Sequence, residues 1–367
     1  MTPITSIRAL IRLLAVLIAV AVLGGCAAEA PKIQKKFYFP PLPERPRIEW
    51  LRAYSSQNDF PKSGFSSFLA ALLGEEPPLD FDKPLDIKST GDGIVYVTDP
   101  AVAKVFIYDL KNGRVSFLQA PDNFDRPIGL ALDAQENVYV SDGGHKNIMV
   151  FDRSGTHLRT LGDKKDYEAP GAITIDQQKK RLYLVDTKGH KVVVYDLAGT
   201  LLFSFGERGD ADGQLNFPGP VAVNRKGEVI VGDTMNSRIQ IYDSDGKFVR
   251  KFGRRGDGPA DFQIIKGVAV DSDQNIYVTD GKGHKFSIYS PTGDYLLTVG
   301  ALYSVLNTGR EAAGGFVIPQ GIDIDRNDTI YVVDQMNRRF QIFQYISDRY
   351  LSEHPITGYE EKPQPLK

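Results

Sequence analysis

One sequence pattern recurs six times between Phe81 and Phe343, and it constrains the fold more than any single residue does. Its clearest copy reads Phe124-Asp-Arg-Pro-Ile-Gly-Leu-Ala-Leu-Asp133, and after a short turn continues as Val138-Tyr-Val-Ser-Asp142. An aspartate closes the second apolar run of every copy, at positions 99, 142, 186, 233, 280 and 334. The steps of 43, 44, 47, 47 and 54 residues indicate the blades of a β-propeller.

Each copy contains four short runs of β-branched and aromatic residues, separated by turns rich in Gly, Asp, Asn or Lys. In the fourth copy these runs are Val221–Asn224, Glu228–Gly232, Arg238–Asp243 and Phe248–Phe252. The alternation predicts four consecutive antiparallel strands per copy. A single four-stranded sheet cannot bury both of its faces, so the six sheets must stack around a centre to build a core. We therefore predict an all-β fold, a six-bladed β-propeller over residues 47–346.

The ring needs a strand from the N-terminal side to close. The sixth copy ends after its third run, Arg339–Ile346, while a run without a copy of its own, Arg47–Tyr54, precedes the first blade. Pairing these two runs would complete the sixth blade and remove two exposed sheet edges. The predicted closing strand, 47–54, contains Trp50, the only tryptophan, which we interpret as a packing anchor of the closure.

The first residues have the features of a secretion signal. Arg8 and Arg12 precede an apolar stretch of eleven residues, Leu13–Leu23, which is too short to span a bilayer as a helix. It is followed at once by Leu23-Gly-Gly-Cys26, which resembles the bacterial lipobox. That resemblance implies a lipoprotein signal peptide over 1–25, cleavage before Cys26 and diacylglycerol on its thiol. Cys26 is the only cysteine, so no disulfide partner competes for it.

Three further segments lie outside the repeats. Residues 26–46 hold five prolines, and such stretches form extended spacers, so we predict a lipidated stalk. Between the closing strand and the first blade, helical spacing predicts a short helix over 63–74, laid over the ring, whose apolar face consists of Phe65, Phe68, Leu69, Leu72 and Leu73. Residues 347–367 are interpreted as a C-terminal tail.

The copies resemble NHL repeats. The fourth copy matches that pattern through Asp233-Thr-Met-Asn236-Ser-Arg238-Ile-Gln240, and the sixth through Asp334-Gln-Met-Asn337-Arg-Arg339-Phe-Gln341. The resemblance covers about 81–346, and together with the lipobox it makes the whole chain similar to a bacterial NHL-repeat lipoprotein. The absence of Asp after Cys26, where Ala27 stands, implies sorting to the outer membrane by the same resemblance. The repeat is specific for the fold and weak for the function, because such propellers serve enzymes, RNA binders and scaffolds.

Three histidines occupy equivalent positions in Gly-His-Lys turns, namely His145, His190 and His284. Three His side chains can form a catalytic zinc site. These turns join the second and third strands, however, and therefore lie at least one strand spacing, about 4.8 Å, outside the innermost strands. Turns on blades two, three and five are then too far apart to place nitrogens about 2.0 Å from one ion. We predict structural or surface roles for them, and no metal.

Two groups of propeller enzymes provide a further test by resemblance. Amidating lyases place their zinc histidines directly after the proline that precedes each inner strand, where this chain has Leu85, Ile128, Gly171 and Gln320. Lactonase-type propellers hold calcium with inward Glu, Asn and Asp, whereas here only Asp86 and Asp323 lie near the inner strands. The repeated closing Asp is interpreted as a turn residue that accepts hydrogen bonds from backbone N–H groups. We therefore predict no catalytic residues and no cofactor.

The charge balance argues against nucleic acid as a partner. The chain has 44 basic and 46 acidic residues, a net charge of −2, without the basic surplus of nucleic-acid binders. The loops that precede the inner strands are expected to share one face with the Gly-His-Lys turns, and this face is locally basic. Its candidate binding residues are Arg126, His145, Lys165, His190, Arg254, Arg255, His284 and Arg310.

These observations favour a non-enzymatic propeller, anchored by lipid to the outer membrane, that presents its loop-rich face to another protein of the cell envelope as an interaction or accessory scaffold. The membrane contact would be made through the lipid anchor. The alternative is a propeller lyase or hydrolase with a metal at the central channel.

Overall fold

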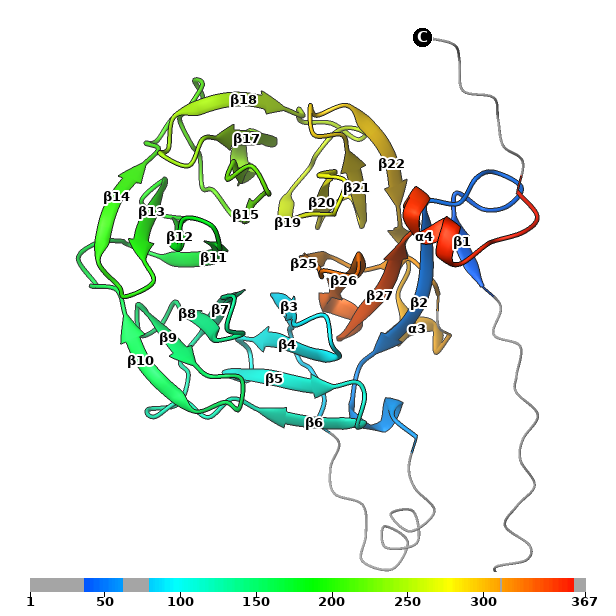
Figure 1. Cartoon of the computed structure of the whole chain (residues 1–367), viewed down its shortest axis with the longest axis horizontal. Coiled ribbons are helices and arrows are strands. Elements are labelled where there is room, and N and C mark those ends of the chain that lie inside the picture. The colour runs from blue at the N-terminus through cyan, green and yellow to red at the C-terminus, as the bar shows by residue number, and fades with distance from the viewer. Residues whose placement is uncertain (1–35, 62–78, 311, 360–367) are drawn as a thin grey trace, which may run out of the picture. The chain divides into compact units, whose positions relative to one another are not determined.

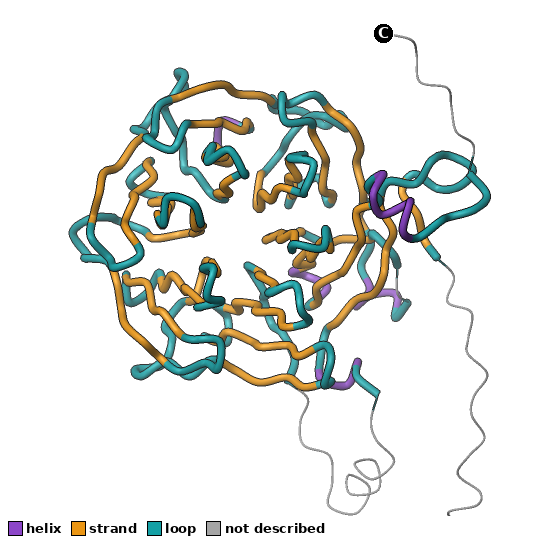
Figure 2. The backbone as a smooth tube through the Cα atoms, in the orientation of Figure 1, coloured by secondary structure: helices purple, strands orange, loops and turns teal. Residues whose placement is uncertain are grey.

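The computed structural model of the chain describes residues 36–61, 79–310 and 312–359. Six antiparallel sheets surround a central channel, each with its first strand innermost (Figures 1 and 2). The six-bladed propeller predicted from the repeat is confirmed. Each buried core cluster joins two neighbouring blades: Tyr139 of blade two packs with Leu184 of blade three, for example. The alternating apolar residues of each strand thus fill the wedge between two sheets, which is why no blade has a core of its own.

The first three blades have four strands each. In chain order these are β3 (Ile87–Ser89), β4 (Ile94–Asp99), β5 (Lys104–Asp109), β6 (Arg114–Phe117), β7 (Pro127–Leu132), β8 (Val138–Asp142), β9 (Asn147–Phe151), β10 (His157–Leu161), β11 (Pro170–Asp176), β12 (Arg181–Asp186), β13 (Lys191–Asp196) and β14 (Leu201–Phe205). Every neighbouring pair within a blade is antiparallel.

Blades four and five repeat this order, and blade six takes strands from both parts of the chain. The strands are β15 (Val221–Val223), β16 (Val229–Asp233), β17 (Arg238–Tyr242), β18 (Phe248–Phe252), β19 (Ile265–Val270), β20 (Ile276–Asp280), β21 (Lys285–Tyr289), β22 (Tyr295–Val299), β25 (Pro319–Ile324), β26 (Thr329–Asp334) and β27 (Arg339–Tyr345). A small parallel pair, β23 (Ala301–Leu302) and β24 (Gly315–Phe316), lies in the loop between blades five and six.

The N-terminal strand closes the ring as predicted. Strand β2 (Ile48–Tyr54) pairs with β27 in antiparallel register, with Ile48 opposite Tyr345 and Tyr54 opposite Phe340. Trp50 lies in this closure, where its indole N–H donates to Oε1 of Gln341 over 3.0 Å. Figure 1 shows β2, from the start of the chain, beside β27 from its end.

Blade six has a fifth strand that we did not predict. Strand β1 (Phe37–Phe39) pairs with β2, and the Phe37 ring packs against that of Trp50, with centroids 5.9 Å apart. The stalk prediction for 26–46 is therefore wrong for this part, because three consecutive aromatic residues form a strand just before the prolines at 40, 41, 43 and 46. Residues 26–35 and Cys26, like the signal peptide at 1–25, lie outside the described residues.

The C-terminal segment also departs from the prediction of a plain tail. It begins with a short helix, α4 (Asp348–Glu353), and Asp348 pairs with Arg45 over 2.5 Å. The predicted helix at 63–74 lies outside the described residues. The remaining described helical elements are α3 (Val305–Thr308) and three 3-10 turns at η1 (Gln57–Asp59), η2 (Thr234–Asn236) and η3 (Gln335–Asn337). Within the described ranges, no helix is both long and apolar enough to cross a membrane.

The inner strands approach each other so closely that hydroxyl groups join them. Thr98, Ser141 and Thr279 each donate to a backbone carbonyl at the start of the next inner strand, over 2.9, 2.6 and 2.5 Å. Glycine is required beside some of these contacts: a Cβ atom at Gly129 would lie 2.8 Å from the carbonyl oxygen of Gly171. The spacing between neighbouring inner strands is therefore held by side chains at the ends of the second strands.

Candidate functional site

The closing aspartates organise the loop-rich face. Each is buried and accepts the backbone N–H of the residues that lead into the inner strand of its own blade. Asp142, for example, accepts from the amides of Asp125 and Arg126 over 2.8 and 3.0 Å. Asp99, Asp186 and Asp280 make the same pair of contacts in blades one, three and five. These contacts agree with the interpretation of the repeated Asp as a turn residue.

Blades four and six use the aspartate differently. In blade four, one carboxylate oxygen of Asp233 accepts from the side chains of Asn236, Arg238 and Gln240, over 2.8, 2.7 and 3.2 Å. The other oxygen accepts a single loop amide, that of Asn216, over 2.7 Å. Blade six repeats this network with Asp334, Asn337, Arg339 and Gln341 around one carboxylate. The motif residues of these two copies therefore form a buried structural network.

His190 and His284 supply the acceptor that this network displaces. The second loop amide of blade four belongs to Phe217, and it donates to Nδ1 of His190, on blade three, over 3.1 Å. In blade six the amide of Ile318 donates to Nδ1 of His284, on blade five, over 3.2 Å. Both amides belong to residues with positive φ, 46° and 57°, a conformation that bulky and β-branched residues rarely adopt. The two rings thus hold strained loops of the next blade.

His145 has no such role. Its Nδ1 lies 3.3 Å from the Asp142 carboxylate of its own blade, and its side chain is 36% exposed. The next loop, before blade three, is held instead by Asp186, which accepts both amides there, and by the Tyr167 hydroxyl, which donates to the carbonyl of Lys146. The three equivalent histidines therefore separate into two that join blades and one that does not.

The other predicted binding residues are exposed on the loops. Arg126 donates to the carbonyl of Gly143, Arg255 donates to that of Met235, and Arg254 pairs with Asp261 over 2.8 Å. Lys165 is 89% exposed, and Arg310 is also exposed. The structure does not gather these residues into one cluster. They are distributed over the loops of blades two to six.

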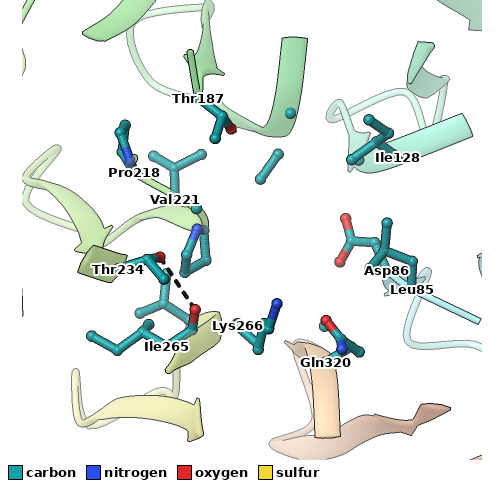
Figure 3. Close-up of a pocket in the computed structure, with 18 of the residues that line it drawn as sticks. Leu85, Asp86, Ile128, Thr187, Pro218, Val221, Thr234, Ile265, Lys266 and Gln320 are labelled. Atoms are coloured by element: carbon teal, nitrogen blue, oxygen red, sulfur yellow. Dashed lines mark hydrogen bonds between the residues drawn. The ribbon is translucent and has the colours of Figure 1, made fainter. Parts of the chain in front are cut away.

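A cavity opens at the channel mouth on this face. Its volume is about 360 Å³, and its walls come from the first residues of the inner strands and from the loop 217–220. Figure 3 shows Leu85, Ile128, Val221 and Ile265 around it, with the polar side chains of Lys266, Gln320 and Asp86 directed toward its centre. The mouth is thus mainly apolar with a few convergent polar groups, the composition common in small-molecule sites.

Lys266 is the functional candidate that the sequence analysis missed. It occupies the position after the inner-strand proline. Blade five has Ile265 where the other five blades have Pro84, Pro127, Pro170, Pro218 or Pro319, so a comparison based on that proline does not find it. Aligning Ile265-Lys-Gly267 with Pro319-Gln-Gly321 would have found it. Partial burial lowers the pKa of Lys266 below its usual value.

Three charged side chains, Asp86, Lys88 and Asp323, lie along the channel between its two cavities. Lys88 pairs with Asp323 over 2.7 Å, and Asp86 accepts the backbone N–H of Leu130 over 2.8 Å. Burial raises the pKa of Asp86 to about 6, against the opposing effect of Lys88. Burial alone would lower the pKa of Lys88, but the carboxylates of Asp323 and Asp86 raise it above its usual value. Lys88 also lines a second cavity, of about 510 Å³, at the other end of the channel.

Metal ligands do not gather at either end among residues 36–61, 79–310 and 312–359: no three His, Cys, Asp or Glu side chains there lie together as a metal site would require. Lys88 lies near both Asp86 and Asp323, the two carboxylates noted from the sequence, and forms an ion pair with Asp323.

Comparisons with known proteins agree on the fold. Residues 115–205 and 221–302 match the family model DUF5128, described as a 6-bladed beta-propeller. The chain is a six-bladed propeller. No curated protein matches it in sequence.

Solved structures with this fold have diverse descriptions. A Bacteroides thetaiotaomicron protein of unknown function is 18% identical, with 72% of this chain and 70% of that one covered and a TM-score of 0.57. A catalytically inactive virginiamycin B lyase from Staphylococcus aureus, solved with quinupristin, is 15% identical, with 74% and 85% covered and a TM-score of 0.53. A putative gluconolactonase is 14% identical, with 72% and 89% covered and a TM-score of 0.55. Likeness at these identities shows the fold alone.

Proposed function

We propose that this protein is a lipid-anchored NHL-type propeller of the outer membrane that binds another envelope protein with its loop-rich face. The observation that supports this most is the surface around the channel mouth. Phe217, Met235 and Met336 are 40%, 46% and 44% exposed there. Exposed aromatic and methionine side chains beside arginines are the composition of the centre of a protein interface.

The basic residues of this face favour a partner that carries acidic groups. Arg255 extends from the loop of blade five to the carbonyl of Met235 in blade four, so a positive charge borders one of the exposed methionines directly. Arg254 and Arg126 lie exposed on the same face. The partner surface that complements this arrangement is apolar at its centre and acidic at its margin.

The histidines do not favour the alternative of a metal enzyme. Nδ1 of His190 and of His284 each already accepts a backbone amide, and each ring supports the loop of a different blade. These structural contacts are all that a scaffold role would require of the two histidines.

Photo-crosslinking on the loop-rich face tests the proposal. A photoreactive residue replaces Met235 in the full-length chain, and in a matched variant it replaces Lys226, which is exposed on the turn 224–227 at the other end of blade four. We expect a discrete crosslinked product only from position 235, and its loss when Arg254 and Arg255 are both changed to Glu. A product of equal size and yield from position 226, or none from 235, would refute the proposed interface.

Membrane attachment is tested separately through Cys26. Changing Cys26→Ser should abolish labelling by fatty acid and leave the precursor uncleaved, because the thiol would be the acceptor of the lipid. A single acyl chain binds membranes only weakly, whereas the diacylglycerol expected on this thiol carries two chains, which is enough for a stable anchor. Fatty-acid labelling of the Cys26→Ser chain would contradict the lipobox interpretation.

A further inference from the structure

Lys266, at the channel mouth, has no counter-ion among the residues that the structure describes. In the part of the chain that the structure describes, the Lys266 ammonium makes neither an ion pair nor a hydrogen bond, and its exposed side chain extends over a cavity whose walls are mainly apolar (Figure 3). We propose that the channel mouth is a binding site for an apolar carboxylate, with the carboxylate group held by Lys266. The cavity shares Phe217 and Met235 with the protein interface proposed above, but the ligand site is tested on the chain alone.

The size and the walls of the cavity suit such a ligand. A volume of about 360 Å³ lies within the range of sites for small molecules, about 300 to 1,000 Å³. Leu85, Ile128, Val221 and Ile265 line it from four different blades. Burying that apolar surface supplies binding free energy, and a single polar group fixes the orientation.

The local charges identify the polar group as an anion with one charge. Of the two lysines that line the cavity, Lys88 is neutralised by Asp323 at 2.7 Å, which leaves Lys266 as the uncompensated one. An ammonium group in partly apolar surroundings is stabilised when an anion pairs with it. Phosphate groups are typically held by several donors together, whereas one ammonium matches one carboxylate.

Asp86 raises the question of whether the ligand also carries an amine. Its carboxylate faces the same cavity (Figure 3), and an ammonium group on the ligand would pair with it. Asp86 accepts the backbone amide of Leu130, however, whereas Lys266 has no hydrogen-bond partner among the described residues. We therefore assign the ligand an anion for Lys266, and the amine is tested separately.

Calorimetric titration of the full-length chain in a non-ionic detergent tests the site. The probes are 4-phenylbutyrate and its neutral amide, which have the same shape. We expect one carboxylate bound per chain, with a dissociation constant at least about tenfold lower than that of the amide, the effect of one charge-assisted hydrogen bond. Lys266→Met keeps an apolar side chain of similar length and should reduce this ratio to about one. Lys188→Gln removes a charge from an exposed position on the same face that does not line the cavity, and should leave the ratio unchanged.

Two further probes separate the possible sources of the carboxylate. The peptide acetyl-Gly-Ser-Gly-Leu, with a free or an amidated C-terminus, tests the end of a polypeptide. A preference for the free peptide that is lost in Lys266→Met, without binding of 4-phenylbutyrate, would assign the site to a chain terminus. Saturable binding of 4-phenylbutyrate with the same dependence would assign it to a small acid.

Three results would overturn the proposal. They are the absence of saturable binding by either acid, equal binding of acid and amide, and an acid preference that persists in Lys266→Met. Tighter binding of L-phenylalanine than of 4-phenylbutyrate, lost in Asp86→Asn, would replace it by a site for a zwitterion. None of these results would alter the crosslink expected at position 235, so failure of this site and failure of the interface are distinguishable.

Discussion

Blades three and five each use a histidine to hold the loop of the following blade, whereas blade two carries the same Gly-His-Lys turn without that contact. The difference comes from the neighbour. Blades four and six, which follow blades three and five, contain the Asn-Arg-Gln network around Asp233 and Asp334. Blade three, which follows blade two, has Lys191 in place of the arginine. Equivalent residues in a repeat therefore acquire their role from the acceptors available in the next blade.

The number of available carboxylate acceptors explains the division. In blades one, two, three and five, the closing Asp accepts two loop amides with its two oxygens. In blade four, Asn236, Arg238 and Gln240 donate to one oxygen of Asp233. The other oxygen then accepts only one loop amide, that of Asn216. The remaining amide is partly buried and needs another acceptor, because an unpaired buried N–H costs about 1–3 kcal/mol. His190 and His284 meet that need from outside the blade.

The largest expected effect is that of removing an arginine from this network. Arg238 and Asp233 are 9% and 0% exposed, and the guanidinium also donates to the carbonyls of Asp210, Ala211 and Gln214. Arg238→Met should lower the free energy of unfolding by about 3–5 kcal/mol, because a buried carboxylate loses its partner. Arg238→Lys, which restores the residue of blades three and five, should cost less. Denaturant unfolding of both variants measures this, and equal losses would show that a positive charge at this position contributes nothing without the guanidinium hydrogen bonds.

An intermediate effect is expected for the two histidines that join blades. His190→Ala and His284→Ala each remove the acceptor of one loop amide, so each should lower the free energy of unfolding by about 1–3 kcal/mol. The His190→Ala variant also loses the contact between the imidazole and the Phe217 ring, whose centroids lie 4.5 Å apart. His190→Gln is the matched variant, because its amide oxygen can accept the same N–H group. Hydrogen exchange of the Phe217 amide should be faster in the Ala variant and closer to the wild-type rate in the Gln variant.

The parts of this arrangement that were predictable are those encoded within one repeat. The ring, the role of the closing Asp and the strand at 47–54 follow from local patterns that recur, or from one visible gap in them. The contact between His190 and Phe217 joins two blades, so it depends on which acceptors the next copy has left free. Strand β1 was hidden by the prolines that follow Phe39, and Lys266 by the absence of a proline before it. Departures from the repeat thus carried the information that periodicity alone could not supply.

The smallest effect is expected at His145, and it is the sharpest test of the comparison. The Asp142 carboxylate already accepts four backbone amides, those of Asp125, Arg126, Gly144 and His145 itself. The buried carboxylate is therefore satisfied without the imidazole ring of His145. His145→Ala should therefore change the free energy of unfolding by no more than about 0.5 kcal/mol, as for an ordinary surface position. The control is His190→Ala, which makes the same chemical change at an equivalent position one blade further on. A loss at His145 as large as that at His190 would mean that the Gly-His-Lys turn stabilises its own blade, and the dependence on the neighbouring blade would be wrong.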